Sequence, residues 1–253
     1  MKKLLLILLC LPMLFSSCQE NNPLPQVVNE VSQSWEKTFN LGHGYSVQQT
    51  SDGGYIITGN TGYSNGDGVI YLIKTDASGV EQWSQTFGGI GSYSGNCVQQ
   101  TTDGGYIICG NKYSDGYNDA YLIKTDASGV EQWSQTFDEI GDYGNYVQQT
   151  SDGGYIICGG KIVAAGELNE NYDVCLIKTD VNGVEVWSKY FGGLGGQNGF
   201  SVQQTNDGGY IITGHADLTN NIGVIYLYRE ICLVYDFLVG VFLLYYTFYL
   251  KKT

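Results

Sequence analysis

Tyrosines and carboxylates gather in the segments of this 253-residue chain that differ most from one another. Tyrosine rings stack on sugars and anchor protein interfaces, so these segments carry the chemistry of a binding surface. The expected ligand is a glycan or a protein, and the alternative is a hydrated loop surface with no ligand. The candidate binding residues are Tyr63, Tyr113, Tyr117, Tyr143, Tyr172, Asp115, Asp119 and Asp142.

Catalytic groups are sparse by comparison. The two histidines, His43 and His215, belong to no Ser-His-Asp spacing, and the chain has no phosphate loop or dinucleotide fingerprint. We expect no cofactor and no metal site. Paired carboxylates could still hydrolyse glycosides, with Asp138, Glu139 and Asp142 as the nearest candidates. A carbohydrate-active enzyme is therefore the alternative to a non-catalytic binding or scaffold module.

The variable segments alternate with a repeated unit. Each unit contains Val-Gln-Gln-Thr followed by Asp-Gly-Gly-Tyr-Ile-Ile, and the first three continue with Leu-Ile-Lys-Thr-Asp. Self-similarity at a period of 20–50 residues is the signature of repeat architectures. The four copies of Val-Gln-Gln-Thr begin at Val47, Val98, Val147 and Val202.

Each unit divides into four short β-prone runs. Asp-Gly-Gly lies between the first two runs and Asp-x-x-Gly between the last two. Both predict tight turns, because glycine accepts the positive φ that such turns require. Four antiparallel strands per unit form the blade of a β-propeller, so we predict an all-β propeller over residues 35–228. One tryptophan per unit should pack between neighbouring blades. These are Trp35, Trp83, Trp133 and Trp187.

The full repeat reads Asp-Gly-Gly-Tyr-Ile-Ile-Thr-Gly and then Leu-Ile-Lys-Thr-Asp-x-x-Gly-x-x-x-Trp-Ser-x-Thr-Phe-Gly-Gly. It resembles the propeller-type repeats of large secreted bacterial and archaeal surface proteins, and more loosely quinoprotein-type blades. The resemblance covers residues 35 to about 228. It implies the blade architecture and says little about a ligand, because propellers host many functions.

The order of the runs leaves the blade arrangement open. A lone run like the fourth strand, Trp35–Phe39, precedes three complete units, and the fourth unit has only three runs. The lone run either completes the fourth blade and closes a ring of four, or the chain is an open part of a larger propeller.

Antiparallel alternation separates the repeated turns from the variable loops. The Asp-Gly-Gly and Asp-x-x-Gly turns share one end of each blade, the turn end, and the variable segments share the other, the loop end. Variation on a rigid scaffold is where binding surfaces usually lie. The predicted loops are 60–68, 111–119, 160–173 and 215–223 within units, and 40–44, 88–96, 138–145 and 192–199 between them.

The cysteines indicate core positions more than chemistry. Cys109 and Cys158 occupy the place that Thr58 and Thr213 fill in the other units, which predicts a small buried site. No Cys-x-x-Cys pair is present, so neither a zinc site nor a redox motif is expected.

The N-terminus has the pattern of an export signal. Lys2 and Lys3 precede the apolar run Leu4–Phe15, and two serines then lead to Cys18. We predict a signal peptide over 1–17. Leu-Phe-Ser-Ser-Cys resembles a bacterial lipoprotein processing site, which implies lipidation of Cys18 and a polar tether over 18–34; plain secretion is the alternative.

These features predict a protein of the cell envelope, anchored by its N-terminal lipid to the outer membrane or cell surface. The formal net charge of −13 disfavours nucleic acid as a partner. The tail, 229–253, breaks the repeat within its third strand and contains the apolar stretch Ile231–Leu250. It is either a transmembrane segment with Lys251 and Lys252 on the cytoplasmic side, or the product of a frameshift.

Overall fold

The computed structural model describes residues 34–62, 68–89, 91–114, 116–137, 142–166, 169–192, 196–218 and 222–230. Residues Trp35–Thr253 form one compact unit, separate from Met1–Ser34. The described part of this unit is built from antiparallel strands, which agrees with the predicted all-β class. The predicted signal peptide, Cys18, the tether up to residue 33 and the tail from residue 231 lie outside the described residues.

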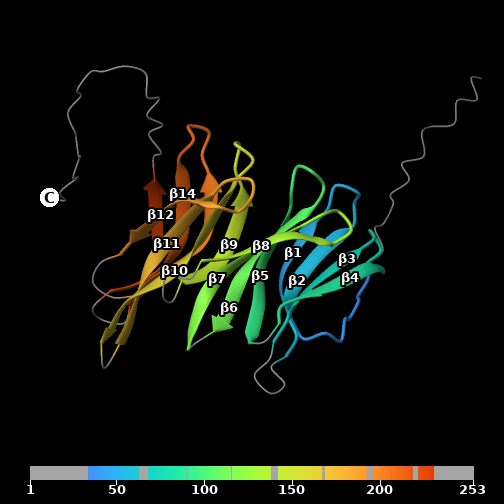
Figure 1. Cartoon of the computed structure of the whole chain (residues 1–253), viewed down its shortest axis with the longest axis horizontal. Coiled ribbons are helices and arrows are strands. Elements are labelled where there is room, and N and C mark those ends of the chain that lie inside the picture. The colour runs from blue at the N-terminus through green and yellow to red at the C-terminus, as the bar shows by residue number, and fades with distance from the viewer. Residues whose placement is uncertain are drawn as a thin grey trace, which may run out of the picture. The chain divides into compact units, whose positions relative to one another are not determined.

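The strands form four antiparallel sheets, one per repeat (Figure 1). Blade 1 contains β1 (His43–Gln49), β2 (Tyr55–Asn60), β3 (Ile70–Thr75) and β4 (Glu81–Phe87). Blade 2 contains β5 (Ser92–Gln100), β6 (Tyr106–Ser114), β7 (Tyr117–Thr125) and β8 (Glu131–Phe137). Blade 3 contains β9 (Asp142–Gln149), β10 (Tyr155–Gly166), β11 (Asn169–Thr179) and β12 (Glu185–Phe191). Blade 4 has three strands, β13 (Gln197–Gln204), β14 (Tyr210–Leu218) and β15 (Ile222–Glu230).

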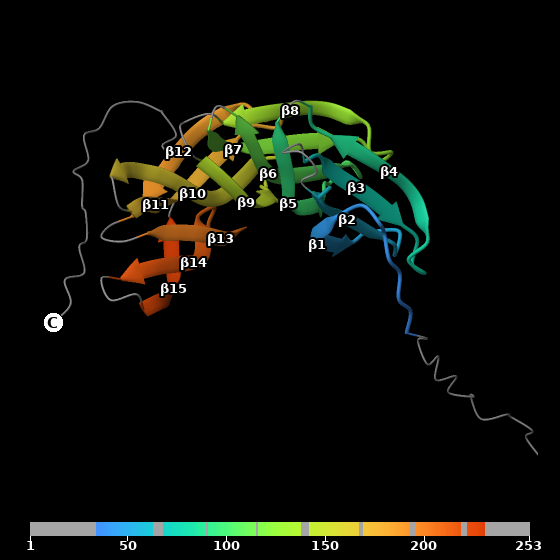
Figure 2. The same ribbon diagram turned by 90° about the horizontal axis from the view of Figure 1, so that it is seen from below.

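The blades follow one another along an open arc. Packing between sheets joins β2 to β5, β6 to β9 and β10 to β13, so each blade lies against the next one in the chain. Figures 1 and 2 show blades 1 and 4 at opposite ends of this arc. Of the two predicted arrangements the structure therefore has the open one. The run Trp35–Phe39 is not a strand of blade 4, which has three strands in the part of the chain described.

The first hairpin of each blade is fixed by its aspartate. In blade 2, Asp103 accepts hydrogen bonds from the Thr101 hydroxyl and from the Gly105 N–H (3.0 Å), while Gly104 adopts a φ of 83°. Lys124 on β7 reaches the same carboxylate, with Nζ 2.8 Å from Asp103 Oδ2. The aspartate therefore caps its own turn, and the buried lysine adds an ion pair.

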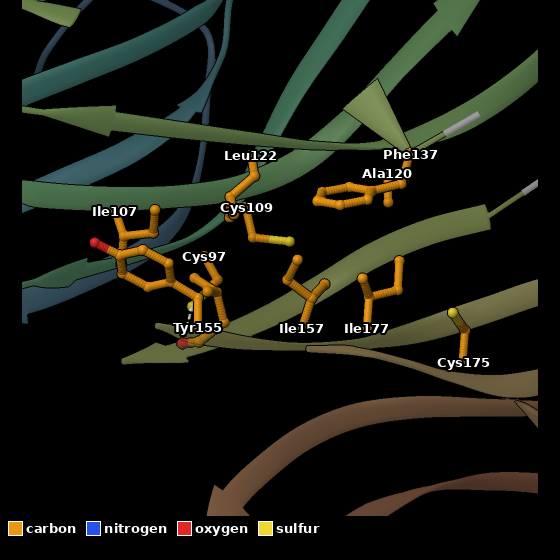
Figure 3. Packing of buried hydrophobic residues seen from close by; sticks show 11 residues of the cluster. Cys97, Ile107, Cys109, Ala120, Leu122, Phe137, Tyr155, Ile157, Cys175 and Ile177 are labelled. Atoms are coloured by element: carbon orange, nitrogen blue, oxygen red, sulfur yellow. Dashed lines mark hydrogen bonds between the residues drawn. The ribbon is translucent and has the colours of Figure 1, made fainter. Parts of the chain in front are cut away.

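Each blade has two apolar faces, because successive side chains of a strand point to opposite sides of its sheet. We call the face toward the preceding blade the front face and the other the back face. On β6, Ile108 packs forward with Ile56 of blade 1, whereas Ile107 packs backward with Tyr155 and Ile157 of blade 3. Figure 3 shows this second cluster, in which the two sheets interdigitate.

Trp83, Trp133 and Trp187 occupy the blade interfaces, as the sequence predicts, whereas Trp35 is half exposed on blade 1. Trp133 on β8 meets Tyr155 of blade 3 edge to face, with ring centroids 5.7 Å apart. Its ring also covers Gly183, where an added Cβ would lie 2.5 Å from a ring carbon. A side chain larger than hydrogen at that turn would therefore displace the tryptophan.

The cysteines with described side chains lie in these interfaces too. Cys109 and Cys158 are buried, which confirms the predicted small core position. Burial raises the pKa of the Cys158 thiol to about 12, so this thiol stays protonated at neutral pH. Cys97, Cys109, Cys158 and Cys175 are all unbridged.

The side chains of glutamines fasten the innermost strands of consecutive blades. The Gln100 N–H donates to Gln48 Oε1 of blade 1 (2.6 Å), and the Gln100 side-chain oxygen accepts from the Ser51 N–H (2.8 Å). The Gln204 N–H donates in the same way to Gln148 Oε1 between blades 3 and 4 (2.7 Å). Backbone donors on the inner edge thus find partners without a further strand.

Candidate binding surface at the loop end

The hairpins at the loop end are longer than the sequence indicated. Lys112 pairs with Asp119 and Tyr113 with Asn118, so the strands β6 and β7 extend into the range 111–119. The strands β10 and β11 likewise extend to Gly166 and from Asn169. The prediction of loops over 111–119 and 160–173 is therefore wrong, because the backbone satisfies its hydrogen bonds by continuing the ladder. In these two hairpins only the residues between Ser114 and Tyr117 and between Gly166 and Asn169 lie outside the strands.

Two candidate tyrosines stand at the tip of the β6–β7 hairpin. Tyr113 is 47% exposed and Tyr117 is 46% exposed. Both rings lie on paired strands, since Tyr117 is opposite Ser114 in the register. A large ring held by a strand ladder loses little further freedom on binding, which favours contact with a ligand.

Two further candidates form a pair in blade 3. Tyr143 on β9 and Tyr172 on β11 are half-buried and meet edge to face, with centroids 5.6 Å apart and an interplanar angle of 65°. The strand β10 runs between them, and Tyr143 is opposite Gly160 there. The structure therefore brings together two residues that are 29 positions apart in the sequence.

The acidic candidates behave differently from the tyrosines. Asp119 is buried, 7% exposed, and accepts a hydrogen bond from the Ser114 hydroxyl (3.3 Å). Its assignment to an exposed loop surface is therefore corrected: this carboxylate stays inside the hairpin. Asp142 begins β9, and its side chain is outside the described residues, as are Tyr63, Asp115, Asp138 and Glu139.

Asp173 is a further carboxylate of the predicted loop 160–173, and its side chain is partly buried. It occupies in blade 3 the place of Asp119 in blade 2, three residues before the leucine of Leu-Ile-Lys-Thr. Burial raises the pKa of Asp173 above its ordinary value. The sequence signal for this burial is the repeat position of Asp173, which in blade 1 holds the apolar residue Val69.

Asparagines hold the blades together beneath this surface. Asn96 Nδ2 donates to the Gly144 carbonyl (2.8 Å), and Asn111 Oδ1 accepts from the N–H of the same glycine (2.9 Å). Asn145 Nδ2 donates onward to the Gly199 carbonyl (2.9 Å). The sequence analysis did not identify these residues, although each of Asn96 and Asn145 directly follows a repeated glycine.

A cavity of about 440 Å³ opens at the turn end, between blades 2 and 3. Its polar walls include Asp103 and Lys124, which are already bonded to each other, and its apolar wall is Trp133. Groups of the same kind recur at the other turns. The lining is therefore the repeated structural framework, and its charges are largely committed to one another.

Among the described residues no group of three or more His, Cys, Asp or Glu could hold a metal ion. In the same part of the chain no helix is long and apolar enough to cross a membrane. What the structure shows at this end is two exposed tyrosine rings on paired strands.

No family model and no curated protein matches this chain. Among solved structures, the chain is similar to the endo-arabinase from Bacteroides thetaiotaomicron VPI-5482, with 9% identity, 80% of each chain covered and a TM-score of 0.46. It is also similar to a GH43 endo-arabinanase from Bacillus licheniformis, with 12% identity, 76% of this chain and 95% of that chain covered, and a TM-score of 0.29. Likeness at this level gives no information about what this chain binds or does.

Proposed function

We propose that this chain is a non-catalytic binding or scaffold module of the cell envelope, exported and anchored through a lipid on Cys18. Its β-propeller blades present a ligand-binding surface at the loop end. The observation that carries the proposal is the exposure of Tyr113 and Tyr117 on paired strands, at the end where the repeats differ. Exposed aromatic rings on a rigid support are typical of ligand contacts.

A glycan or a protein suits this surface. The C–H faces of sugars stack on tyrosine rings, and a protein partner would use the same rings as anchors. The net charge of −13 works against phosphate-rich polymers, which leaves uncharged or cationic ligands. The Tyr143–Tyr172 pair adds a second aromatic contact at the same end of the neighbouring blade.

The binding test applies the full-length chain, in mild detergent, to an array of uncharged and charged glycans. The same sample is applied to surface proteins of the cell that produces the chain. A hydrolysis assay on the same glycans measures the release of reducing ends. Saturable binding without release of reducing ends is the expected result. Release of reducing ends would instead support a carbohydrate-active enzyme.

The anchor is tested separately. Mass spectrometry of the mature N-terminus should find a diacylglyceryl-modified Cys18, and Cys18→Ala should move the protein out of the membrane fraction. Cys10→Ala is the matched control, because that cysteine lies in the predicted signal peptide and is removed with it. An unmodified Cys18 on a membrane-free protein would leave plain secretion as the explanation.

A further inference from the structure

The front face of a blade is an apolar surface that the preceding blade covers. Each front face carries the valine of Val-Gln-Gln-Thr and the tyrosine and second isoleucine of Gly-Tyr-Ile-Ile. In blades 2, 3 and 4 these side chains are at most 2% exposed. They are Val98, Tyr106, Ile108, Val147, Tyr155, Ile157, Val202, Tyr210 and Ile212.

The front face of blade 1 has the same residues, and no other blade in the described part of the chain covers them. Val47 is 64% exposed, and Tyr55 and Ile57 are only half-buried. These three line an apolar groove of about 380 Å³ together with Trp35 and Phe39. Trp35 is itself 49% exposed. Blade 1 is therefore built to be covered.

Trp35 already takes the position of an interface tryptophan. Its ring meets Tyr55 at 5.7 Å and 63°, the same geometry as Trp133 on Tyr155 at 5.7 Å and 63°. It also lies against Gly79, as Trp133 lies against Gly183. The run Trp35–Phe39 is thus placed as the outermost strand of a blade preceding blade 1 would be.

The back face of blade 4 is also more exposed than the back faces of the other blades. Ile211 is half-buried and Thr213 is exposed, whereas their equivalents in blade 1, Ile56 and Thr58, are fully buried under blade 2. Blade 4 also has three strands among the described residues, so β15 ends the sheet with no outer partner there. Blade 4 thus has no fourth strand among the residues described, and the run Trp35–Phe39 beside blade 1 has the sequence of one.

We propose that a second copy of this chain covers these faces: blade 4 of each copy packs on blade 1 of the other, and Trp35–Phe39 of one copy pairs with β15 of the other. Blade 4 of the same chain is disfavoured as the cover of blade 1, because blades 1 and 4 stand at opposite ends of the arc (Figure 2). The three internal interfaces are already well packed in that open arrangement. Two reciprocal contacts of this kind close a two-fold symmetric ring.

The experiment measures the mass of the full-length chain in mild detergent by light scattering, with the detergent contribution subtracted. Two protein chains per particle are expected. Val47→Asp should reduce this to one chain with unchanged circular dichroism, because the residue is exposed within a single chain. Val80→Asp is the matched control, since Val80 is 52% exposed and its equivalents Val130 and Val184 are exposed in packed blades as well. It should leave two chains.

A mixing experiment identifies the geometry. Ile211→Asp spoils the back face of blade 4 and Val47→Asp spoils the front face of blade 1, so each variant alone should be a single chain. Mixed together they retain one intact contact, and particles containing one chain of each variant should form. A wild-type particle with one chain, particles with more than two chains, or a Val47→Asp variant that stays paired would each overturn the proposal.

Discussion

The two ends of the blades differ in how closely their residues and contacts repeat from blade to blade. At the turn end, Asp52, Asp103 and Asp152 repeat the same contacts, each with a buried lysine from the third strand of its blade. At the loop end, neighbouring blades differ in length and composition, and exposed rings such as Tyr113 meet solvent. Repetition in this chain therefore marks residues that hold the blades, and variation marks the surface that can serve a ligand.

The strongest way to break this comparison is to remove a ring from an internal interface. Trp133→Ala should lower the free energy of unfolding by about 3 kcal/mol, the lower end of the range for core aromatic residues, because this partly buried ring packs against the cluster between blades 2 and 3. Trp35→Ala is the matched control, since that ring is half exposed on an open face. Both changes are made in the full-length Val47→Asp variant, which is expected to be a single chain. Urea unfolding with and without each tryptophan change measures the two losses. Equal losses would show that the internal interfaces contribute no special stability.

The ion pairs at the turn end should have a smaller effect. Asp103→Asn removes the carboxylate that faces Lys124, whose side chain is only 4% exposed. Because the carboxylate itself is largely exposed, we expect a loss of about 1–2 kcal/mol. Asp126→Asn at the next turn is the control, since that carboxylate bonds only backbone N–H groups of its own turn among the contacts described. Thermal unfolding at neutral pH compares them.

The same pair predicts a dependence on acid. Burial alone would raise the pKa of Asp103, but hydrogen bonds from Lys124, Thr101 and Gly105 outweigh it and hold the pKa at about 2. A carboxyl whose pKa is lower in the folded state stabilises the fold above its unfolded pKa, and this contribution is lost as the pH falls toward 2. The stability difference between wild type and Asp103→Asn should therefore shrink between about pH 4 and pH 2. A difference that stays constant over this range would rule out the ion pair as its cause.

These contacts also show what the sequence could reveal. The turns, the four-strand unit and the packing of Trp133 between blades follow from local spacing, so they were predictable. The burial of Lys124 was not, although its place between Ile123 and Thr125 in a third strand was a usable signal. Asp119 was assigned to the surface wrongly, because composition cannot show that a polar segment continues as a paired hairpin. The Tyr143–Tyr172 contact depends on strand register, which the repeat pattern alone does not fix at the loop end.

The glutamine side-chain hydrogen bonds between inner strands should contribute less to the free energy of unfolding than the ion pairs do. Gln100→Ala removes the acceptor for the Ser51 N–H of blade 1 and should lower the free energy of unfolding by about 0.5–1.5 kcal/mol. Gln49 occupies the same repeat position in blade 1, where the side chain bonds only its own turn among the contacts described. Gln49→Ala should therefore cost less in urea unfolding, and the reverse order would contradict the role assigned to these glutamines.

The smallest effect on stability is expected at the loop end. The double variant Tyr113→Ala/Tyr117→Ala should change the free energy of unfolding by less than about 0.5 kcal/mol, as exposed substitutions usually do. Chemical unfolding next to wild type measures this. A loss as large as that of Trp133→Ala would mean that these tyrosines hold the blade, and the distinction between the two ends would fail.

The most direct measurement is the affinity of that double variant for the ligand found on the glycan array or among the surface proteins. We expect at least a tenfold weaker Kd for Tyr113→Ala/Tyr117→Ala, equivalent to about 1.4 kcal/mol or more. The turn-end control Val130→Ala/Val184→Ala removes two apolar side chains of 57% and 56% exposure and should bind like wild type. Unchanged binding by the tyrosine variant, or loss of binding by the valine variant, would contradict the assignment of the ligand to the loop end.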